Sequence, residues 1–342
     1  MKTDEKAVMD ETRPSSANGK PMAFTFGDPE SVLDNSLTDY LGTFLDDIQD
    51  FYVPPVSQRG LIQTMSANAH HGSCIYFKRN LLVQRYIPSP LLSLMDLYKA
   101  ALDFEATGNA YLQIFTNAFG QQLRLGHLPG VNMRYGNHPY GGKAYCMLKR
   151  NGDKIWFDPG EVIHIKEYDP LQTIYGLPQF MGGLQAALLG EDATLFRRRY
   201  FKNGSHMGYI FYTNDPNMPE EVESKIINDI RAGKGVGNFK SMFINIPNGG
   251  EKAVQIIPIG DISQKDEFER IKRISADEVL VAHRMQPSLA GVKPENTAGF
   301  GDIQKISDVY IRNEIGPKAM VFMHSVNEHL KNGKKINFDI PD

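Results

Sequence analysis

The sequence predicts a mixed fold of the α+β class, in which helices and an antiparallel sheet occupy separate runs of the chain. Two observations support this prediction. The spacing of apolar residues changes from a helical period to the period of strands after Gly108 and becomes helical again at Pro178. The chain has 342 residues, 41% of them hydrophobic and 23% charged, which is typical of a globular protein with two or three cooperative units.

The composition also excludes several classes of protein. With 40 acidic against 37 basic residues, the chain has no bulk attraction for DNA, so any contact with nucleic acid must be local or weak. No apolar run reaches the length of a membrane span, and the first twenty residues lack the apolar core of a secretory signal. Residues 1–22 are polar and are expected to form a flexible arm. Cys74 and Cys146 fit a reducing cytoplasm, although they would still allow one disulfide.

Three helices are expected before the sheet. Apolar spacing over 57–83 predicts two helices separated by a turn near Gly72. The stretch 89–107 predicts a third, because its first serine can serve as N-cap, Pro90 suits the first helical position and Gly108 can end it.

The sheet that follows is expected to be antiparallel. Its strands are short runs rich in β-branched and aromatic residues, and glycine, asparagine and proline separate them. These runs cover residues 109–115, 122–128, 132–135, 143–149 and 161–168.

Two long helices enclose a small lobe rich in strands. The first is expected to begin at Pro178 and to end near Gly204, with a length of roughly 37 Å for about 25 residues. The second is expected over 263–285, antiparallel to the first. A short helix at 219–232 is expected in the lobe, and a hairpin is expected where Asn248-Gly249 separates the last two of its three strands. These strands cover 208–213, 240–246 and 253–259.

The C-terminal part is expected to contain a loop and a kinked helix. The segment 292–302 carries glycines and a proline but no apolar run, which predicts a mobile loop. Asp302 then begins a helix that runs to about Lys331. Gly316-Pro317 should kink this helix, because proline removes a backbone donor.

This order of elements resembles the portal (connector) proteins of tailed bacteriophages, particularly those of phages with contractile tails. The resemblance covers roughly residues 25–332. Gln286-Pro287 stands where many relatives have two prolines, and the short tail leaves the size of any crown domain open. The matching stretches are GNAY at 108–111, EVIHIKEYDP at 161–170, IYGLPQF at 174–180, FRRRYFKNGSHMGYIFY at 196–212, HRMQPSLAG at 283–291 and NEIGPKAM at 313–320.

The resemblance implies a portal fold with a helical and β wing, a two-helix stem, a small α/β clip, a tunnel loop and a long kinked helix. The corresponding ranges are the flexible arm at 1–22, the wing at 23–177, the first stem helix at 178–207, the clip at 208–261, the second stem helix at 262–287, the tunnel loop at 288–302, and the kinked helix with a short wing or crown segment at 303–342.

The resemblance also implies the function of a structural protein. Twelve copies would form a ring at one capsid vertex, assembled in the host bacterial cytoplasm, and double-stranded DNA would be packaged and ejected through it without sequence specificity. The partners would be the terminase motor, capsid and scaffold proteins, and later head-completion or tail proteins. Neither a cofactor nor a catalytic residue is expected. Twelve chains would carry a net charge of roughly −36 (12 × −3), which would suit a channel that DNA must slide through.

Three adjacent arginines, Arg197, Arg198 and Arg199, lie near the end of the first long helix. Successive helical residues point about 100° apart, so the three side chains cannot all face one partner. We expect ion pairs with acids at the beginning of the second long helix, although a solvated helix end and a direct grip on phosphate remain as alternatives. These acids are Asp266, Glu267 and Glu269.

Two further sets of polar residues follow from the resemblance. Mobile polar tips in the tunnel loop would face DNA, and they are Lys293, Glu295, Asn296 and Thr297. The outer surface of the clip would dock the motor, through Glu220, Glu221, Lys234, Asn248 and Lys252.

Two other readings of the chain are possible. The carboxylates and the histidine of EVIHIKEYD would have to converge for a metal-dependent nuclease or phosphoesterase, but a strand places Glu161 and Glu167 on the face opposite His164. The second alternative is a monomeric docking module.

Three further motifs are weaker. Asp169 extends the acidic cluster, and His70, His71, Cys74 and Cys146 have no recognised zinc spacing. The glycines of GKGVGN at 233–238 follow a predicted helix instead of joining a strand to a helix, so they indicate a turn and not a phosphate loop.

Overall fold

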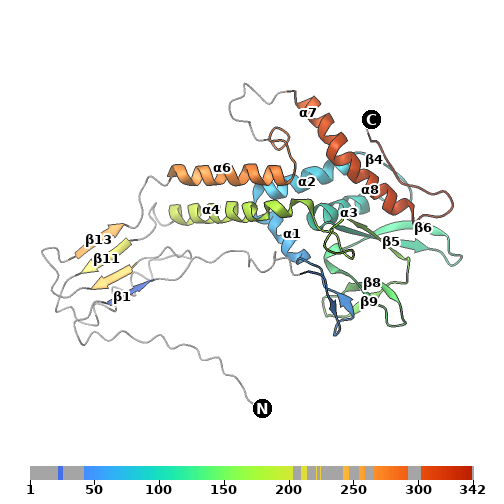
Figure 1. Cartoon of the computed structure of the whole chain (residues 1–342), viewed down its shortest axis with the longest axis horizontal. Coiled ribbons are helices and arrows are strands. Elements are labelled where there is room, and N and C mark those ends of the chain that lie inside the picture. Colours follow the sequence, from blue (N-terminus) through green and yellow to red (C-terminus); the bar gives the residue numbers. More distant parts are fainter. Residues whose placement is uncertain are drawn as a thin grey trace, which may run out of the picture. The chain divides into compact units, whose positions relative to one another are not determined.

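The computed structural model describes most of the chain and divides it into two units. The described residues are 22–25, 42–202, 209–213, 221, 224, 242–245, 254–258, 265–291 and 302–340 (Figure 1). The first unit comprises Met1–Val32 and Ala193–Arg270, and the second comprises Leu33–Asp192 and Ile271–Asp342. The boundary between the units falls within two long helices, α4 (Leu184–Lys202) and α6 (Lys265–Ala282). Helices and strands are mixed, as the sequence predicts.

The first unit contains a four-stranded sheet with the order β1-β12-β11-β13. Three predicted strands are confirmed as β11 (Tyr209–Thr213), β12 (Met242–Asn245) and β13 (Val254–Pro258), and β1 (Met22–Thr25) adds a fourth. The predicted hairpin between the last two strands is wrong. Both pair with β11, on opposite sides: β12 parallel and β13 antiparallel. An Asn-Gly pair favours a local turn, but the long-range pairing of strands decides the neighbours.

The first two helices of the second unit are those that the sequence predicts, α1 (Gln58–Ala67) and α2 (Ala69–Gln84). They separate at Asn68 and not near Gly72. Asn68 has extended backbone angles, and its side chain accepts hydrogen bonds from the N–H groups of His70 and His71. Gly72 lies inside α2, where a Cβ would come within 2.3 Å of the Met65 carbonyl oxygen. The glycine therefore permits the close approach of two helices and marks no turn.

The third helix, α3 (Leu94–Thr107), starts later than predicted. Ser93 caps it by accepting a hydrogen bond from the N–H of Asp96 at 3.0 Å. Ser89 instead bonds the N–H of Leu91 and forms an isolated bridge with Leu92. The predicted end at Gly108 is confirmed, since this residue has the left-handed φ of 72° that favours glycine.

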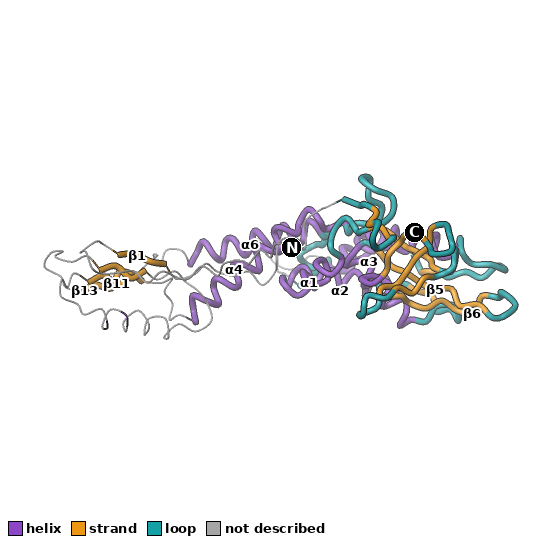
Figure 2. Tube along the Cα trace, turned by 90° about the horizontal axis from the view of Figure 1, so that it is seen from below, coloured by secondary structure: helices purple, strands orange, loops and turns teal. Residues whose placement is uncertain are grey.

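The second unit contains two antiparallel sheets where the sequence predicts one. The first has the order β10-β5-β6, and the second β2-β3-β7-β8-β9. The five predicted strands are confirmed, and β5 and β6 pair along a long hairpin (Figure 2). Their bounds are β5 (Asn109–Thr116), β6 (Gln122–Leu128), β7 (Met133–Asn137), β8 (Lys143–Leu148) and β10 (Val162–Lys166). The additional strands are β2 (Leu45–Asp46), β3 (Phe51–Tyr52) and β9 (Lys154–Trp156).

The first long helix begins as predicted after Pro178, first as the 3₁₀ turn η3 (Gln179–Gly183) and then as α4. In the second unit, α4 and α6 pack antiparallel through small residues. A Cβ added to Gly183 would lie 2.3 Å from the Cβ of Ala282, and Ala187 packs with Val279 one turn further on. The absence of side-chain bulk on this seam lets the two helices approach closely.

The kinked helix has three parts, α7 (Ile303–Tyr310), the π-helical turn η5 (Ile311–Ile315) and α8 (Gly316–Asn327). Asp302 caps α7, as predicted, by accepting a hydrogen bond from the N–H of Lys305. A further strand, β14 (Asn337–Phe338), pairs with β4 (Tyr86–Ile87). The main core of the unit lies between α3, α8 and the β10-β5-β6 sheet, and Phe104 and Phe322 meet there with ring centres 5.1 Å apart. In the described part of the chain, none of the helices has the length and apolarity that crossing a bilayer requires.

Candidate functional site

Most of the polar residues singled out from the sequence lie outside the described residues. This holds for the four residues of the tunnel loop and for four of the five clip residues, while Glu221 is an exposed helical residue. Arg197 and Arg198 are exposed on α4, and the side chains of Arg199, Asp266, Glu267 and Glu269 lie outside the described part. The predicted ion pairs between them therefore stay a prediction. The predicted kink is described in full.

The π-helical turn η5 lies directly before Gly316-Pro317, where the sequence predicts the kink. Pro317 is one of the first residues of α8, where it needs no backbone partner, and η5 precedes it. Because proline has no backbone N–H, one helical hydrogen bond is missing here, and the widened π turn accommodates this gap. A Cβ on Gly316 would come within 3.2 Å of the Ile340 side chain, so the glycine also lets the C-terminal segment pack against the kink.

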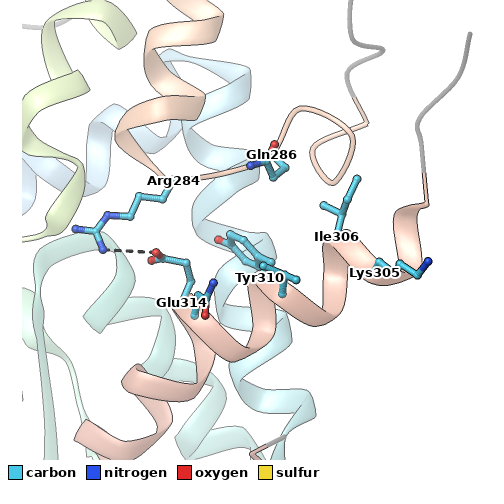
Figure 3. A pocket seen from close by; sticks show the side chains of 8 residues that line it. Arg284, Gln286, Lys305, Ile306, Tyr310 and Glu314 are labelled. Atoms are coloured by element: carbon cyan, nitrogen blue, oxygen red, sulfur yellow. Dashed lines mark ion pairs between the residues drawn. The ribbon is translucent and has the colours of Figure 1, made fainter. Parts of the chain in front are cut away.

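Arg284 lies at the end of α6 and faces this kink. Its φ of 54° lies in the left-handed region, and the N–H of the following Met285 bonds the Leu280 carbonyl at 2.8 Å, as in a Schellman cap. The Arg284 guanidinium lies 3.5 Å from the Glu314 carboxylate of η5 (Figure 3). This pair joins the end of α6 to the kinked helix.

A buried ion pair anchors the other half of the kinked helix. Lys318 Nζ of α8 lies 2.7 and 2.8 Å from the two carboxylate oxygens of Glu105 of α3, and both side chains are buried. Lys78 of α2 is buried nearby, and desolvation together with the charge of Lys318 lowers its pKa to about 8, against the opposing pull of Glu105. Sequence analysis missed this group, since an isolated lysine in a helix gives no sign of its burial.

Two buried histidines join α2 to the end of α6. His71 Nδ1 lies 2.9 Å from His283 Nε2, and His71 Nε2 lies 3.1 Å from the hydroxyl of Thr64. The ring of Phe180 packs edge-on against His71. Burial, reinforced by Lys78, lowers the pKa of His71 to about 4 and that of His283 further. The pair is therefore neutral at physiological pH, and its hydrogen bond connects α2 to the end of α6.

Asn109 connects two of the quoted sequence stretches. Its side chain donates to the carbonyls of Thr107 and Gly176 and accepts from the N–H of Gly176 at 2.6 Å. A Cβ on Gly176 would lie 2.0 Å from the Gly108 carbonyl oxygen, so the backbones are in contact. The stretches at 108–111 and 174–180 are thus parts of a single structural junction.

The residues considered for a metal-dependent enzyme have structural partners. His164 is half-buried and lies within hydrogen-bond distance of Tyr145 and Asn109, and desolvation lowers its pKa well below the ordinary value. Glu161 accepts from Gln113 at 2.6 Å, and Asp169 accepts from the N–H of Leu171. Within the described residues, no group of three or more potential ligands is close enough to hold a metal ion.

The residues considered for zinc are also separated. Cys74 belongs to the main core, whereas Cys146 lies on β8, and both are free thiols. Burial raises the pKa of each to about 11, so neither is a reactive thiolate at neutral pH.

Two grooves on the second unit are lined by helices. The first, the α4–α6 groove, has small residues on its floor and Ile274, Asp277, Glu278 and Val281 along α6. The second, the α7 groove, lies between the end of α6 and α7, and Figure 3 shows its lining. Arg284, Gln286, Lys305, Ile306, Val309, Tyr310, Asn313 and Glu314 form that lining.

Comparison with known proteins gives the same family over most of the chain. The model of the family described as phage portal protein matches residues 88–342. The chain is 42% identical over 306 residues to the probable portal protein of Haemophilus phage HP1, and the alignment covers 88% of both chains. It is 39% identical over 303 residues to the probable portal protein of Escherichia phage P2, with 88% of this chain and 87% of that protein covered.

Solved structures with the same fold are more distant in sequence. One is in the neck of an empty gene transfer agent particle, computed with C6 symmetry, with a TM-score of 0.57, 16% identity and 84% of both chains covered. Another is the portal protein of an HK97 family phage from Corynebacterium diphtheriae, with a TM-score of 0.54, 14% identity, and 78% of this chain and 91% of that chain covered. The fold, the matched family model and the relatives lead to one conclusion: this chain belongs to the phage portal protein family and is a portal protein.

Proposed function

We propose that copies of this chain form a closed ring at one vertex of a phage capsid, and that double-stranded DNA is packaged and ejected through its centre. The observation that supports this most is the likeness to two phage portal proteins over 87–88% of their lengths. The neck structure of similar fold was computed with C6 symmetry, which is the symmetry of a ring assembly and agrees with the proposal.

The proposed parts of the ring follow the ranges predicted from the sequence. The wing is residues 23–177, the two stem helices are 178–207 and 262–287, and the clip is 208–261. The tunnel loop at 288–302 lies between the second stem helix and the kinked helix. In support, α4 and α6 are long helices that run antiparallel where the second unit contains them, and the three strands of the clip lie in one small sheet. The fourth strand of that sheet, β1, comes from the beginning of the range predicted for the wing.

The partners of the ring are part of the same proposal. The polar residues of the tunnel loop, Lys293 to Thr297, face DNA without sequence specificity. The clip, with Glu220, Glu221, Lys234, Asn248 and Lys252, docks the terminase motor and later head-completion or tail proteins, and the outer wing meets capsid and scaffold proteins. Arg197, Arg198 and Arg199 pair with the acids of the second stem helix and lock the stem.

Electron microscopy of the purified protein tests the ring. We expect annular particles with a central hole, and their rotational symmetry gives the number of copies. A chain that elutes at the mass of one subunit at every concentration, and that shows no rings, would contradict the proposal. Incubation of DNA with the protein and Mg²⁺ or Mn²⁺ provides a second readout, because divalent-metal-dependent cleavage would favour the nuclease alternative.

A further inference from the structure

The α4–α6 groove is an open apolar surface on the second unit. Val281 and Ile274 of α6 are 75% and 48% exposed, although both are large apolar residues. On the opposite side of the groove, a Cβ added to Gly182 would meet no atom within 4 Å, so backbone is accessible there. Asp277 and Glu278 are exposed along the same groove. The groove therefore has room for an incoming helix and carries negative charge.

Helix α7 has the apolar face that such a groove could bind. Ile303, Ile306 and Val309 recur every three residues along it, and Ile303 and Val309 are 46% and 48% exposed. Tyr310, the last residue of α7, is buried and packs against Phe77 with ring centres 6.1 Å apart, so the helix is fixed to its own unit at that end. The apolar side chains before it form an amphipathic face of the kind that binds into a groove.

The charges beside the two surfaces allow one complementary contact. On α7, Lys305 is exposed and pairs with Asp302 at 3.2 Å, and Asp308 is a second exposed acid. Asp277 and Glu278 border the α4–α6 groove without a basic residue among its lining, so they offer Lys305 further carboxylates. Opposite potentials favour association and fix which surfaces meet. Two copies of the same surface would instead bring like charges together.

A closed ring of identical chains requires this kind of asymmetry. Each subunit must present two different surfaces, one to each neighbour, because a surface that binds itself gives only a two-fold dimer. We infer that α7 of one copy binds in the α4–α6 groove of the next copy, with Ile303, Ile306 and Val309 against the groove and Lys305 beside Asp277 and Glu278. This inference rests on the proposed ring and names the surfaces that close it.

Two charge-reversing variants test the pairing, and all of their substitutions are at exposed positions. Asp277→Lys with Val281→Lys blocks the groove, and Lys305→Glu with Val309→Glu blocks the helix. The mass of each variant, alone and in a 1:1 mixture, is measured by size-exclusion chromatography with light scattering. Tyr140→Lys, on the 94% exposed tip of the β7–β8 turn, is the control and should assemble like wild type.

The pairing gives a distinctive expected result. Each variant alone should be a folded monomer, and the mixture should form dimers and nothing larger, because each chain retains one intact surface. The dimer also shows that both variants are folded. A chain that carries all four substitutions should stay monomeric, since Val281→Lys and Val309→Glu remove the apolar contacts of both surfaces.

Other results overturn the inference in a recognisable way. Rings from either variant alone, or a mixture that remains monomeric while circular dichroism shows folded chains, would mean that these surfaces are not partners. The dimer of the mixture is the readout of this pairing, and the ring of the wild type is the readout of the proposed function. If wild type itself never assembles, the proposed ring fails, and that outcome is separate from the outcome for the variants.

Discussion

Two ion pairs join the kinked helix to the rest of the second unit, and they differ in burial. Lys318 and Glu105 pair at 2.7 Å, with side chains only 6% and 4% exposed. Arg284 and Glu314 pair at 3.5 Å, and the Arg284 side chain is 60% exposed. The first pair fixes α8, since a buried charge cannot lose its partner without a large cost. The second contributes little, because water competes for the exposed guanidinium of Arg284.

The difference teaches that the kinked helix is held unequally at its two ends. At α8 a buried ion pair and the aromatic contact between Phe104 and Phe322 act together. At α7 only Tyr310 is buried, and the residues before it are at least partly exposed. Local stability should therefore fall from α8 toward α7, as expected where few apolar contacts protect the backbone. The end that is held less firmly is the one that we assign to a neighbouring copy.

The largest expected effect comes from breaking the buried pair. Lys318→Met leaves the Glu105 carboxylate buried without its partner, which should lower the free energy of unfolding by about 3–5 kcal/mol in urea titrations. The pKa of Lys78 should rise at the same time, because the repulsion from Lys318 is removed.

Two controls separate the charge from the packing. Lys318→Met combined with Glu105→Leu should recover most of the lost stability, and Lys99→Met, at an exposed site on α3, should change little. Equal losses in the single and the double variant would mean that volume and not the unpaired carboxylate sets the cost.

Lowering the pH should have the next largest effect on the free energy of unfolding, through the His71–His283 pair. The pKa of His71 is lowered to about 4 from an ordinary value of 6.5, chiefly by burial, so between these values the unfolded chain binds more protons than the folded one. Stability is therefore complete above about pH 6.5 and falls as the pH is lowered toward 4. The slope should be about 1.4 kcal/mol per pH unit for each proton taken up, measured by urea titrations at a series of pH values.

Substitution of both histidines identifies the groups responsible. His71→Leu with His283→Leu should flatten the pH dependence over this window, and His324→Gln, at a 77% exposed site on α8, should leave it unchanged. An unchanged slope in the double variant would assign the acid sensitivity to other residues, such as the half-buried His164, whose pKa is also lowered.

The smallest expected effect is at the exposed ion pair between Arg284 and Glu314. Arg284→Gly and Arg284→Ala both remove the pair with Glu314, but only glycine fits the φ of 54° without strain. The glycine variant should be more stable than the alanine variant by about 1 kcal/mol in thermal or urea unfolding. Equal stabilities would show that the left-handed backbone at the end of α6 is not strained by a side chain.

Local sequence patterns predicted most of the helices and strands, but few of the contacts between them. The strands from Asn109 to Lys166, the end of α3 at Gly108 and the cap of α7 at Asp302 follow from periods and capping residues that act over a few positions. The hairpin at Asn248-Gly249 and the turn near Gly72 were wrong, because strand pairing and helix packing outweighed the local signal.

The candidate site divides in the same way. The interruption of the α-helix at Gly316-Pro317 was predictable, since proline acts on its own helix wherever that helix packs. The pairs Lys318–Glu105 and His71–His283 join residues more than 200 positions apart, so no period or spacing could indicate them.

The sequence by itself determined which segments are helices and strands, where the long helices start, where the last of them is interrupted and, through its quoted stretches, the resemblance to portal proteins. Only the tertiary structure decided which charges are buried, which glycines allow backbones to touch and which apolar faces remain open. The physical reason is range: backbone preferences and capping act within one or two turns, whereas desolvation and close packing depend on chain segments that meet only after folding.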